Sequence, residues 1–360
     1  MERQFDKQKT NVAKGVAVLI LLVHHIFYNY ARGLEFPNMK FLFPRLTYHL
    51  ADYGAFVIFV FATISGYGIA AYMSKKEDNI TKCIIQREIG LLETFIPMYI
   101  LAVGLCAVLN GNLAFLFQTY GATKRDVVIG AAFDMFGISS LFSRPKLNNT
   151  WWYMGATHCI IIFIPILIKL VNVIKSKSAI LLALIVYVGF GQNTAGAQYR
   201  ECVLAAFIGV CMYEGKIIER VDKFFGQKKF GRIFEFVIYV VAVWFVLWFK
   251  ASGALDGYYL WALTVPFTLF IVNDFISKIK GVNFLLAKLG TYSGLIYMLH
   301  TFVYKIIPRL NGITYSMEYA WQAYIFVLVV TLGLSVLLTT VLKLVRYDRL
   351  ILKIKERLLG

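Results

Sequence analysis

Charged side chains are scarce in this sequence. Only 16% of its 360 residues are charged, against about a quarter in an ordinary soluble domain, whereas 59% are hydrophobic. A water-soluble fold cannot hide so large an apolar surplus, and lipid is therefore the predicted solvent for most of the chain. Acidic residues are the rarer kind: 20 stand against 37 Lys and Arg, which gives a net charge of +17.

This basic excess does not indicate a nucleic-acid partner. The Lys and Arg residues fall mostly in short gaps between apolar runs, where they would meet the headgroups of anionic membrane lipid. Cysteine is scarce as well, with five residues, none of them in a CxxC pair. An odd number without ligand-like spacing predicts neither a disulfide framework nor a metal knuckle.

Apolar segments long enough, or nearly so, to cross a membrane core of about 30 Å recur along the chain. The first begins after a basic segment and is predicted to stay as a helix, because no convincing cleavage site follows it. The weakest is 127–142, which is short and contains Asp134. We find eleven such segments, at 12–30, 54–73, 91–109, 127–142, 151–174, 179–197, 201–215, 234–250, 258–277, 288–306 and 321–345.

The charges of the loops decide whether 127–142 spans the membrane. If it does not, 26 of the 37 basic residues lie on the cytoplasmic side, in six clusters. If it does, every cluster from Lys169 onward faces outward, and most of the excess of basic residues on the cytoplasmic side is lost. We therefore exclude 127–142 from the spans.

The predicted fold class is an all-α integral membrane protein of about ten transmembrane helices, with both termini cytoplasmic. Residues 1–345 form one membrane domain. Within it, 110–150 is an extracytoplasmic loop that contains a partly inserted or surface-lying helix. Residues 346–360 form a basic cytoplasmic tail, and the amphipathic stretch 343–357 is predicted to lie on the inner membrane surface.

Ionisable groups inside apolar spans are costly to bury and are candidates for function. Lys14 and His25 are eleven residues apart in the first span, which is close to three helical turns, so they share a face about 16 Å apart along the axis. Asn29 and Arg32 extend this stripe, whereas His24 lies off it. The stripe lines a polar path, or else Lys14 only extends to the headgroups while the histidines bond to neighbouring helices.

Two further histidines, His158 and His300, fall at membrane depth. By the predicted topology both lie toward the outer half, level with His25. No two of the three have the short spacing of zinc ligands, so no metal is expected. A shared polar cavity is the preferred interpretation.

Four segments resemble motifs of the acyltransferase 3 family, and together they cover essentially the whole chain. Residues 14–25 resemble its first-helix signature of Arg, ten residues and His, with Lys14 in place of the Arg. The others are the Ser-Gly-Tyr segment at 59–67, Trp152 followed by Pro165, and the Gly-x-x-Ser…Tyr-x-x-His helix at 289–300. Where many members carry a Glu in the Trp-to-Pro helix, this chain has Thr157 and His158.

The resemblance implies a bacterial O-acyltransferase of the cell membrane that acts on cell-surface polymers. It transfers an acyl group, usually acetyl, from cytoplasmic acyl-CoA to a hydroxyl of an extracytoplasmic polysaccharide, cell-wall polymer or lipid-linked glycan precursor. His25 is the implied catalytic residue, as a general base or as a covalent acyl carrier, and the sequence leaves both open.

Further residues are candidates for contacts with the donor or with the path. They are Lys14, Arg87, Asn29, Trp152, His158 and His300. Two other functions stay open on the residues alone: a transporter or flippase for a glycan-related substrate, which also needs an intramembrane polar path, and a non-catalytic membrane scaffold. No resident cofactor is implied, because acyl-CoA is the donor substrate.

Overall fold

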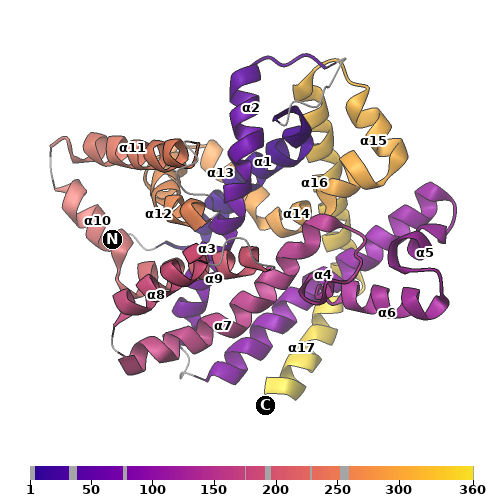
Figure 1. The fold of residues 1–360 in the computed structure, drawn as a ribbon, viewed down its shortest axis with the longest axis horizontal. Coiled ribbons are helices and arrows are strands. Elements are labelled where there is room, and N and C mark those ends of the chain that lie inside the picture. The colour runs from indigo at the N-terminus through magenta and orange to yellow at the C-terminus, as the bar shows by residue number, and fades with distance from the viewer. Residues whose placement is uncertain are drawn as a thin grey trace. The chain divides into compact units, whose positions relative to one another are not determined.

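The computed structural model describes residues 5–31, 39–75, 79–174, 176–190, 196–227, 229–251 and 259–359. Its regular elements in these ranges are helices (Figure 1), and the only extended pairing among them is an isolated bridge between Lys40 and Tyr319. Arg32, the predicted end of the polar stripe, lies outside the described residues. The all-α prediction is confirmed for the part of the chain described.

The chain forms two compact units. The first comprises residues 1–17, 56–84 and 159–291, and the second comprises 18–55, 85–158 and 292–360. Three α-helices have residues in both units, namely α1 (Lys7–Ala31), α4 (Ile80–Asn110) and α7 (Trp152–Ile174), and so does the 3-10 turn η1 (Gly54–Phe56).

In the first unit, α3 (Val57–Met73) and α9 (Ala197–Glu214) touch backbone to backbone. A Cβ added to Gly66 or to Gly209 would lie less than 3.0 Å from a backbone oxygen of the other helix. The hydroxyl of Thr63 also donates to the carbonyl oxygen of Ala205 at 3.0 Å. Small residues permit this kind of approach between helices in membranes. Gly66 makes this contact, whereas Gly68 has open space around it.

The N-terminal half of α1 crosses α13 (Val282–Thr291) in the same way. A Cβ on Gly15 would collide with the backbone of Leu286, and one on Gly290 with the backbone of Asn11. Gly15 follows Lys14 in the first-helix signature, and Gly290 opens the late Gly-x-x-Ser segment. Two stretches far apart in sequence therefore carry glycine because their backbones meet.

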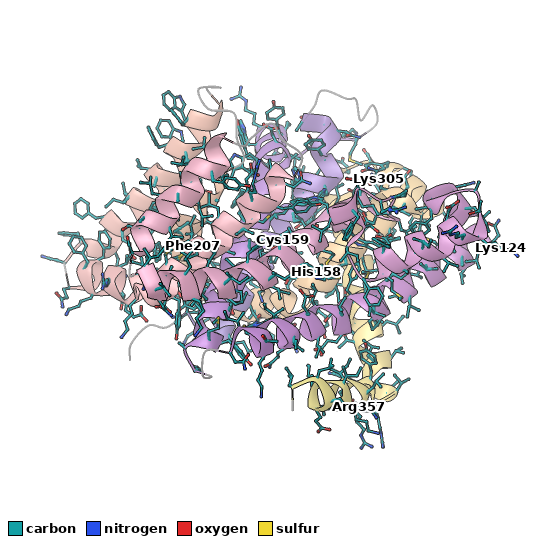
Figure 2. All side chains as sticks on the ribbon, turned by 60° about the horizontal axis from the view of Figure 1, so that its bottom comes forward. Lys124, His158, Cys159, Phe207, Lys305 and Arg357 are labelled. Atoms are coloured by element: carbon teal, nitrogen blue, oxygen red, sulfur yellow. The ribbon has the colours of Figure 1, made fainter. Side chains whose placement is uncertain are left out.

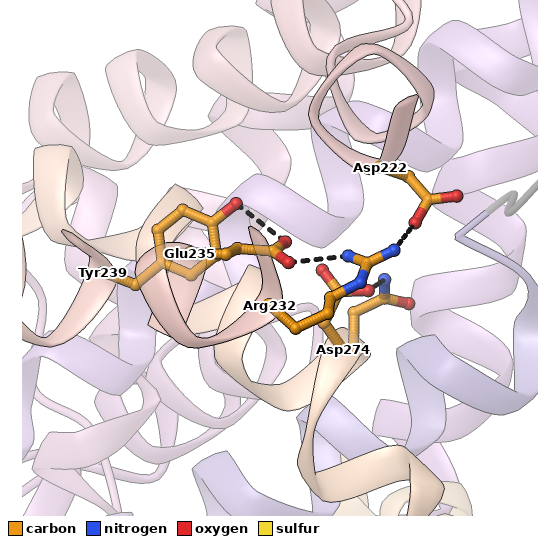
Figure 3. Close-up of polar contacts among 6 residues, drawn as sticks. Asp222, Arg232, Glu235, Tyr239 and Asp274 are labelled. Carbon is orange, nitrogen blue, oxygen red and sulfur yellow. Dashed lines mark hydrogen bonds and ion pairs between the residues drawn. The ribbon is translucent and has the colours of Figure 1, made fainter. Parts of the chain in front are cut away.

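A partly buried ion-pair network links α10 (Ile217–Gly226) to α11 (Gly231–Ala251) in the first unit (Figure 3). Arg232 donates to Glu235 Oε2 at 2.6 Å and also to Asp222. Tyr239 donates to the second oxygen of Glu235 at 3.1 Å. Glu235 is fully buried, and these partners compensate the cost of burying its charge. The remaining helical elements described in this unit are α8 (Lys177–Phe190), α12 (Tyr259–Asp274) and the 3-10 turn η4 (Ile276–Lys278).

The second unit holds the C-terminal half of α1, most of α4 and the first turns of α7. Between α4 and α7 lie two short helices and two 3-10 turns, α5 (Ala114–Tyr120), α6 (Lys124–Met135), η2 (Ser139–Phe142) and η3 (Asn149–Trp151). The other elements of this unit are α2 (Pro44–Tyr53), α14 (Ser293–Thr301), η5 (Phe302–Ile306), α15 (Pro308–Tyr315), α16 (Ala320–Leu344) and α17 (Tyr347–Leu359).

Six helical segments among the described residues are long and apolar enough to cross a membrane, and the broken pair α13 and α14–η5 makes a seventh if it is one span. The other three predicted spans correspond to α8, a shorter apolar helix, and to α9 and α11, so the number ten stays a prediction. The single helix predicted at 288–306 is wrong. It breaks between Thr291 and Ser293, after a glycine and a β-branched residue, both poor helix formers.

The α6 helix agrees with the prediction that 127–142 does not span. It has 12 residues, and at 1.5 Å per residue it is about 18 Å long, too short for a core of about 30 Å. A capping box between Thr123 and Asp126 fixes its start.

Candidate active site

Two imidazole rings face each other in the second unit. His25 on α1 and His300 on α14 have ring centroids 4.9 Å apart. His300 is fully buried, and His25 is half-buried. The structure thus brings together two of the histidines that the sequence placed at a similar membrane depth.

Hydrogen bonding fixes the tautomer of His300. Its Nδ1 lies 3.2 Å from the carbonyl oxygen of Ile296, which can only accept, so Nδ1 carries the proton. In the neutral ring, Nε2 then presents a lone pair. Among the residues that the structure describes, the buried Nε2 atoms of His25 and of His300 have no hydrogen-bond partner. Buried polar groups are normally paired, so each of these nitrogens is placed to receive a group that the protein does not supply.

His24 has a different position from its neighbour. Its Nδ1 donates to the carbonyl oxygen of Ala51 at 2.5 Å, and its ring centroid lies 4.8 Å from that of His25. A Cβ on Gly54 would come within 2.7 Å of the Cβ of His24, so the segment after α2 packs directly on this part of α1. His24 thereby anchors α1 beside His25.

Two tyrosine hydroxyls also hold this half of α1. Tyr315 at the end of α15 donates to the carbonyl oxygen of Ile26 at 3.0 Å, and Tyr324 on α16 donates to that of Leu19 at 3.2 Å. Ile26 directly follows His25 on this helix, and Leu19 precedes His25 by nearly two turns. The position of the imidazole therefore depends on three elements besides its own helix.

The segment before α7 clamps α14 on both sides of His300. The indole nitrogen of Trp151 donates to the carbonyl oxygen of Met298 at 3.0 Å. Asn148 donates to the Thr301 hydroxyl, and the hydroxyl of Tyr297 donates to the backbone of η3. After Thr301 the chain makes a π-helical turn, η5, a feature often found at functional sites.

Paired tryptophans at the start of an apolar run usually indicate an interfacial aromatic belt, but Trp151 belongs to this clamp instead. Trp151 is only 2% exposed and packs against the rings of Phe95 and Phe302, with centroids 5.2 and 5.6 Å away. Trp152, the predicted site residue, is half-buried and contacts the ring of Tyr153. The polar stretch before Trp151 could have indicated a local turn at this position, because its Asn148 caps η3.

A buried carboxylate holds the loop that leads into the clamp. Asp134 on α6 accepts hydrogen bonds from the Tyr120 hydroxyl and from the backbone N–H of Leu147, each at 2.7 Å. Tyr120 in turn lies 3.0 Å from the hydroxyl of Tyr99 on α4. Burial raises the pKa of the Asp134 carboxyl to about 6. Leu147 directly precedes Asn148, so α6 sets the position of the clamp.

A family model described as an acyltransferase domain matches residues 8–340. The chain belongs to the acyltransferase 3 family. All four segments that resemble family motifs lie within the match. No curated protein and no solved structure gives a significant match.

His158 (Figure 2) lies on α7, the helix where many members of the acyltransferase 3 family carry a Glu. Both of its ring nitrogens are engaged. Nδ1 lies 2.7 Å from Glu88 Oε2 on α4, and Nε2 donates to the carbonyl oxygen of Phe136 at 3.0 Å. The carboxylate in this region thus comes from α4. His158 has no lone pair left for substrate, so its geometry favours a structural role.

The other predicted contact residues lie on α1 and α4. Lys14 is half-buried in the first unit, beside the crossing at Gly15. Arg87 is half-buried on α4, and Asn29 is exposed on α1, both in the second unit. Their roles stay predictions. Over the described ranges, no group of three His, Cys, Asp or Glu could hold a metal ion.

Proposed function

We propose that this acyltransferase moves an acyl group, acetyl in the simplest case, from cytoplasmic acyl-CoA to a hydroxyl of an extracytoplasmic glycan. The acceptor is a polysaccharide, a cell-wall polymer or a lipid-linked precursor. The observation that carries the proposal is the pair of buried, unpartnered Nε2 atoms of His25 and His300. A scaffold has no need of two imidazoles held in this state.

The chemistry asked of this pair is ordinary for imidazole. As general base, the Nε2 of His25 accepts the proton of the acceptor hydroxyl while that oxygen attacks the thioester carbonyl carbon. The carbon–sulfur bond breaks, and the CoA sulfur leaves as a thiolate that the imidazolium then protonates. In the covalent alternative, Nε2 attacks the thioester carbonyl carbon, the carbon–sulfur bond breaks and CoA leaves as a thiolate. The hydroxyl then attacks the acyl-imidazole, the carbon–nitrogen bond breaks to restore the neutral imidazole, and the hydroxyl proton passes to the thiolate.

His300 supports either route. Its Nδ1–H is committed to Ile296, so its Nε2 can accept a hydrogen bond from a second hydroxyl of the glycan acceptor, which leaves the proton of the attacking hydroxyl for His25. Lys14 is the proposed contact for the CoA phosphates, as a point charge in place of the family's arginine.

The test uses purified protein in proteoliposomes with acetyl-CoA and a glycan acceptor, with CoA thiol release and acetylated product as readouts. We expect His25→Ala to lower the turnover at least about a hundredfold, the lower range for loss of a general base. His49→Ala is the matched control, since His49 is an exposed histidine of the same unit and should leave turnover unchanged. Undiminished acetylation by a membrane-inserted His25→Ala protein would contradict the proposal.

The same assay separates the two routes. Without acceptor, a covalent acyl-histidine gives a stoichiometric burst of CoA thiol from the native protein. A general base gives no burst.

A further inference from the structure

The α17 helix is a separate amphipathic element beyond the end of the family match at residue 340. It follows α16, a 25-residue candidate span that ends at Leu344. The chain turns between them at Arg346, which has a left-handed backbone (φ 53°). Because a spanning helix ends at the headgroups, α17 begins at the level of a membrane surface, whichever side that is.

One face of α17 packs on the protein. Ile351 is buried, and Tyr347 and Ile354 are half-buried. The ammonium of Lys355 lies 2.7 Å from Glu93 Oε2 on α4. These contacts fix the rotation of the helix about its axis and leave a defined face outward.

The outward face joins a basic stripe to exposed leucines. Arg349, Lys353 and Arg357 are all exposed and follow one another at intervals of four residues, so they lie along one side of the helix. Leu350 and Leu352, 54% and 55% exposed, flank the stripe on its two sides, and the exposed Glu356 lies between the stripe and Leu352. Figure 2 shows Arg357 on this helix at the lower edge of the ribbon.

We propose that this face of α17 binds the surface of a membrane that contains anionic phospholipid. The leucines enter the boundary between headgroups and acyl chains, and the basic stripe pairs with lipid phosphates, as interfacial helices do. The charge matches an anionic surface, and the exposed leucines favour lipid over a free phosphate ligand, which offers them nothing to enter. The inference is independent of the proposed acyl transfer.

The experiment measures amide hydrogen exchange in residues 347–359 of the full chain, reconstituted in two nanodisc compositions. One is phosphatidylcholine alone, and the other is an equal mixture with phosphatidylglycerol. Each basic residue near an anionic surface strengthens association about fivefold. Three such residues should therefore slow exchange at least about tenfold in the anionic bilayer. Equal exchange of the native protein in the two bilayers overturns the proposal without recourse to any variant.

Two variants and a soluble ligand sharpen the result. The triple change Arg349→Gln, Lys353→Gln and Arg357→Gln should abolish the difference between the bilayers, whereas Arg349→Lys with Arg357→Lys, which keeps the charge, should retain it. A difference that persists in the Gln variant excludes the stripe as its source. If CoA or inorganic phosphate added to the neutral bilayer slows exchange equally, the face is a free-anion site, and the proposal fails.

Discussion

Asp134 shows how one buried group can hold a candidate active site at a distance. It is 1% exposed and fixes the N–H of Leu147, one residue before the clamp on α14. Its hydrogen bonds from Tyr120 and Leu147 favour the charged form, but desolvation outweighs them and raises its pKa to about 6. The folded protein therefore holds a proton on Asp134 at pH values where the unfolded chain has released it.

This gives a pH dependence with a definite sign. The pKa of Asp134 in the folded protein lies above its value of about 4 in the unfolded chain. Protonation of Asp134 therefore stabilises the folded protein fully below pH 4, and this stabilisation is lost as the pH rises through about 6. The difference of about two pKa units corresponds to about 3 kcal/mol in the free energy of unfolding. Asp134→Asn keeps an acceptor oxygen and does not titrate, so we expect its unfolding midpoint to rise relative to the native protein between about pH 4 and pH 7. Thermal unfolding in detergent at both pH values measures this, and parallel behaviour of the two proteins would contradict it.

At the scale of elements, the crossing of α3 and α9 depends on which glycine faces the neighbouring helix. Gly66 and Gly68 are two residues apart on α3, so they point in different directions. Only Gly66 lies against the backbone of α9, at Ala206, while Gly68 has open space. The pair forms a matched test of close packing within one helix.

We expect Gly66→Ala to separate the two helices and to lower the unfolding midpoint. Gly68→Ala should leave it unchanged or raise it slightly, because Ala is favoured over Gly in a helix by up to about 1 kcal/mol. Thermal unfolding of both variants in the same detergent measures the difference. An equal fall in the unfolding midpoint of the two variants would show that glycine is needed for some reason other than the approach of α9.

The sequence predicted the helices better than their contacts. Apolar length located most helices correctly, and the family resemblance named His25 and His300 before their rings were seen together. Periodicity alone could not tell that Trp151, not Trp152, reaches α14, because neighbouring residues differ by about 100° and the partner is nearly 150 residues away. The helix break after Gly290 was not predicted either, because an apolar run does not show where its backbone crosses another helix.

At the scale of the whole molecule, the asymmetry of its charges predicts the orientation in the membrane. Most of the basic residues fall in clusters that share one side only if 127–142 does not span, and the short α6 agrees with that condition. An even number of crossings then places the first and last residues of the chain on the same side, the cytoplasmic one.

Epitope tags at the two ends, each behind a protease site, test this orientation. Both tags should be cleaved in inside-out vesicles and protected in right-side-out ones. A third tag inserted after Gly111, in the predicted extracytoplasmic loop and at a non-helical position, is the control and should behave in the opposite way. End tags on opposite sides would mean an odd number of crossings. The charge argument would then fail, and with it the placement of Lys14 toward the cytoplasm and of His25 toward the outside.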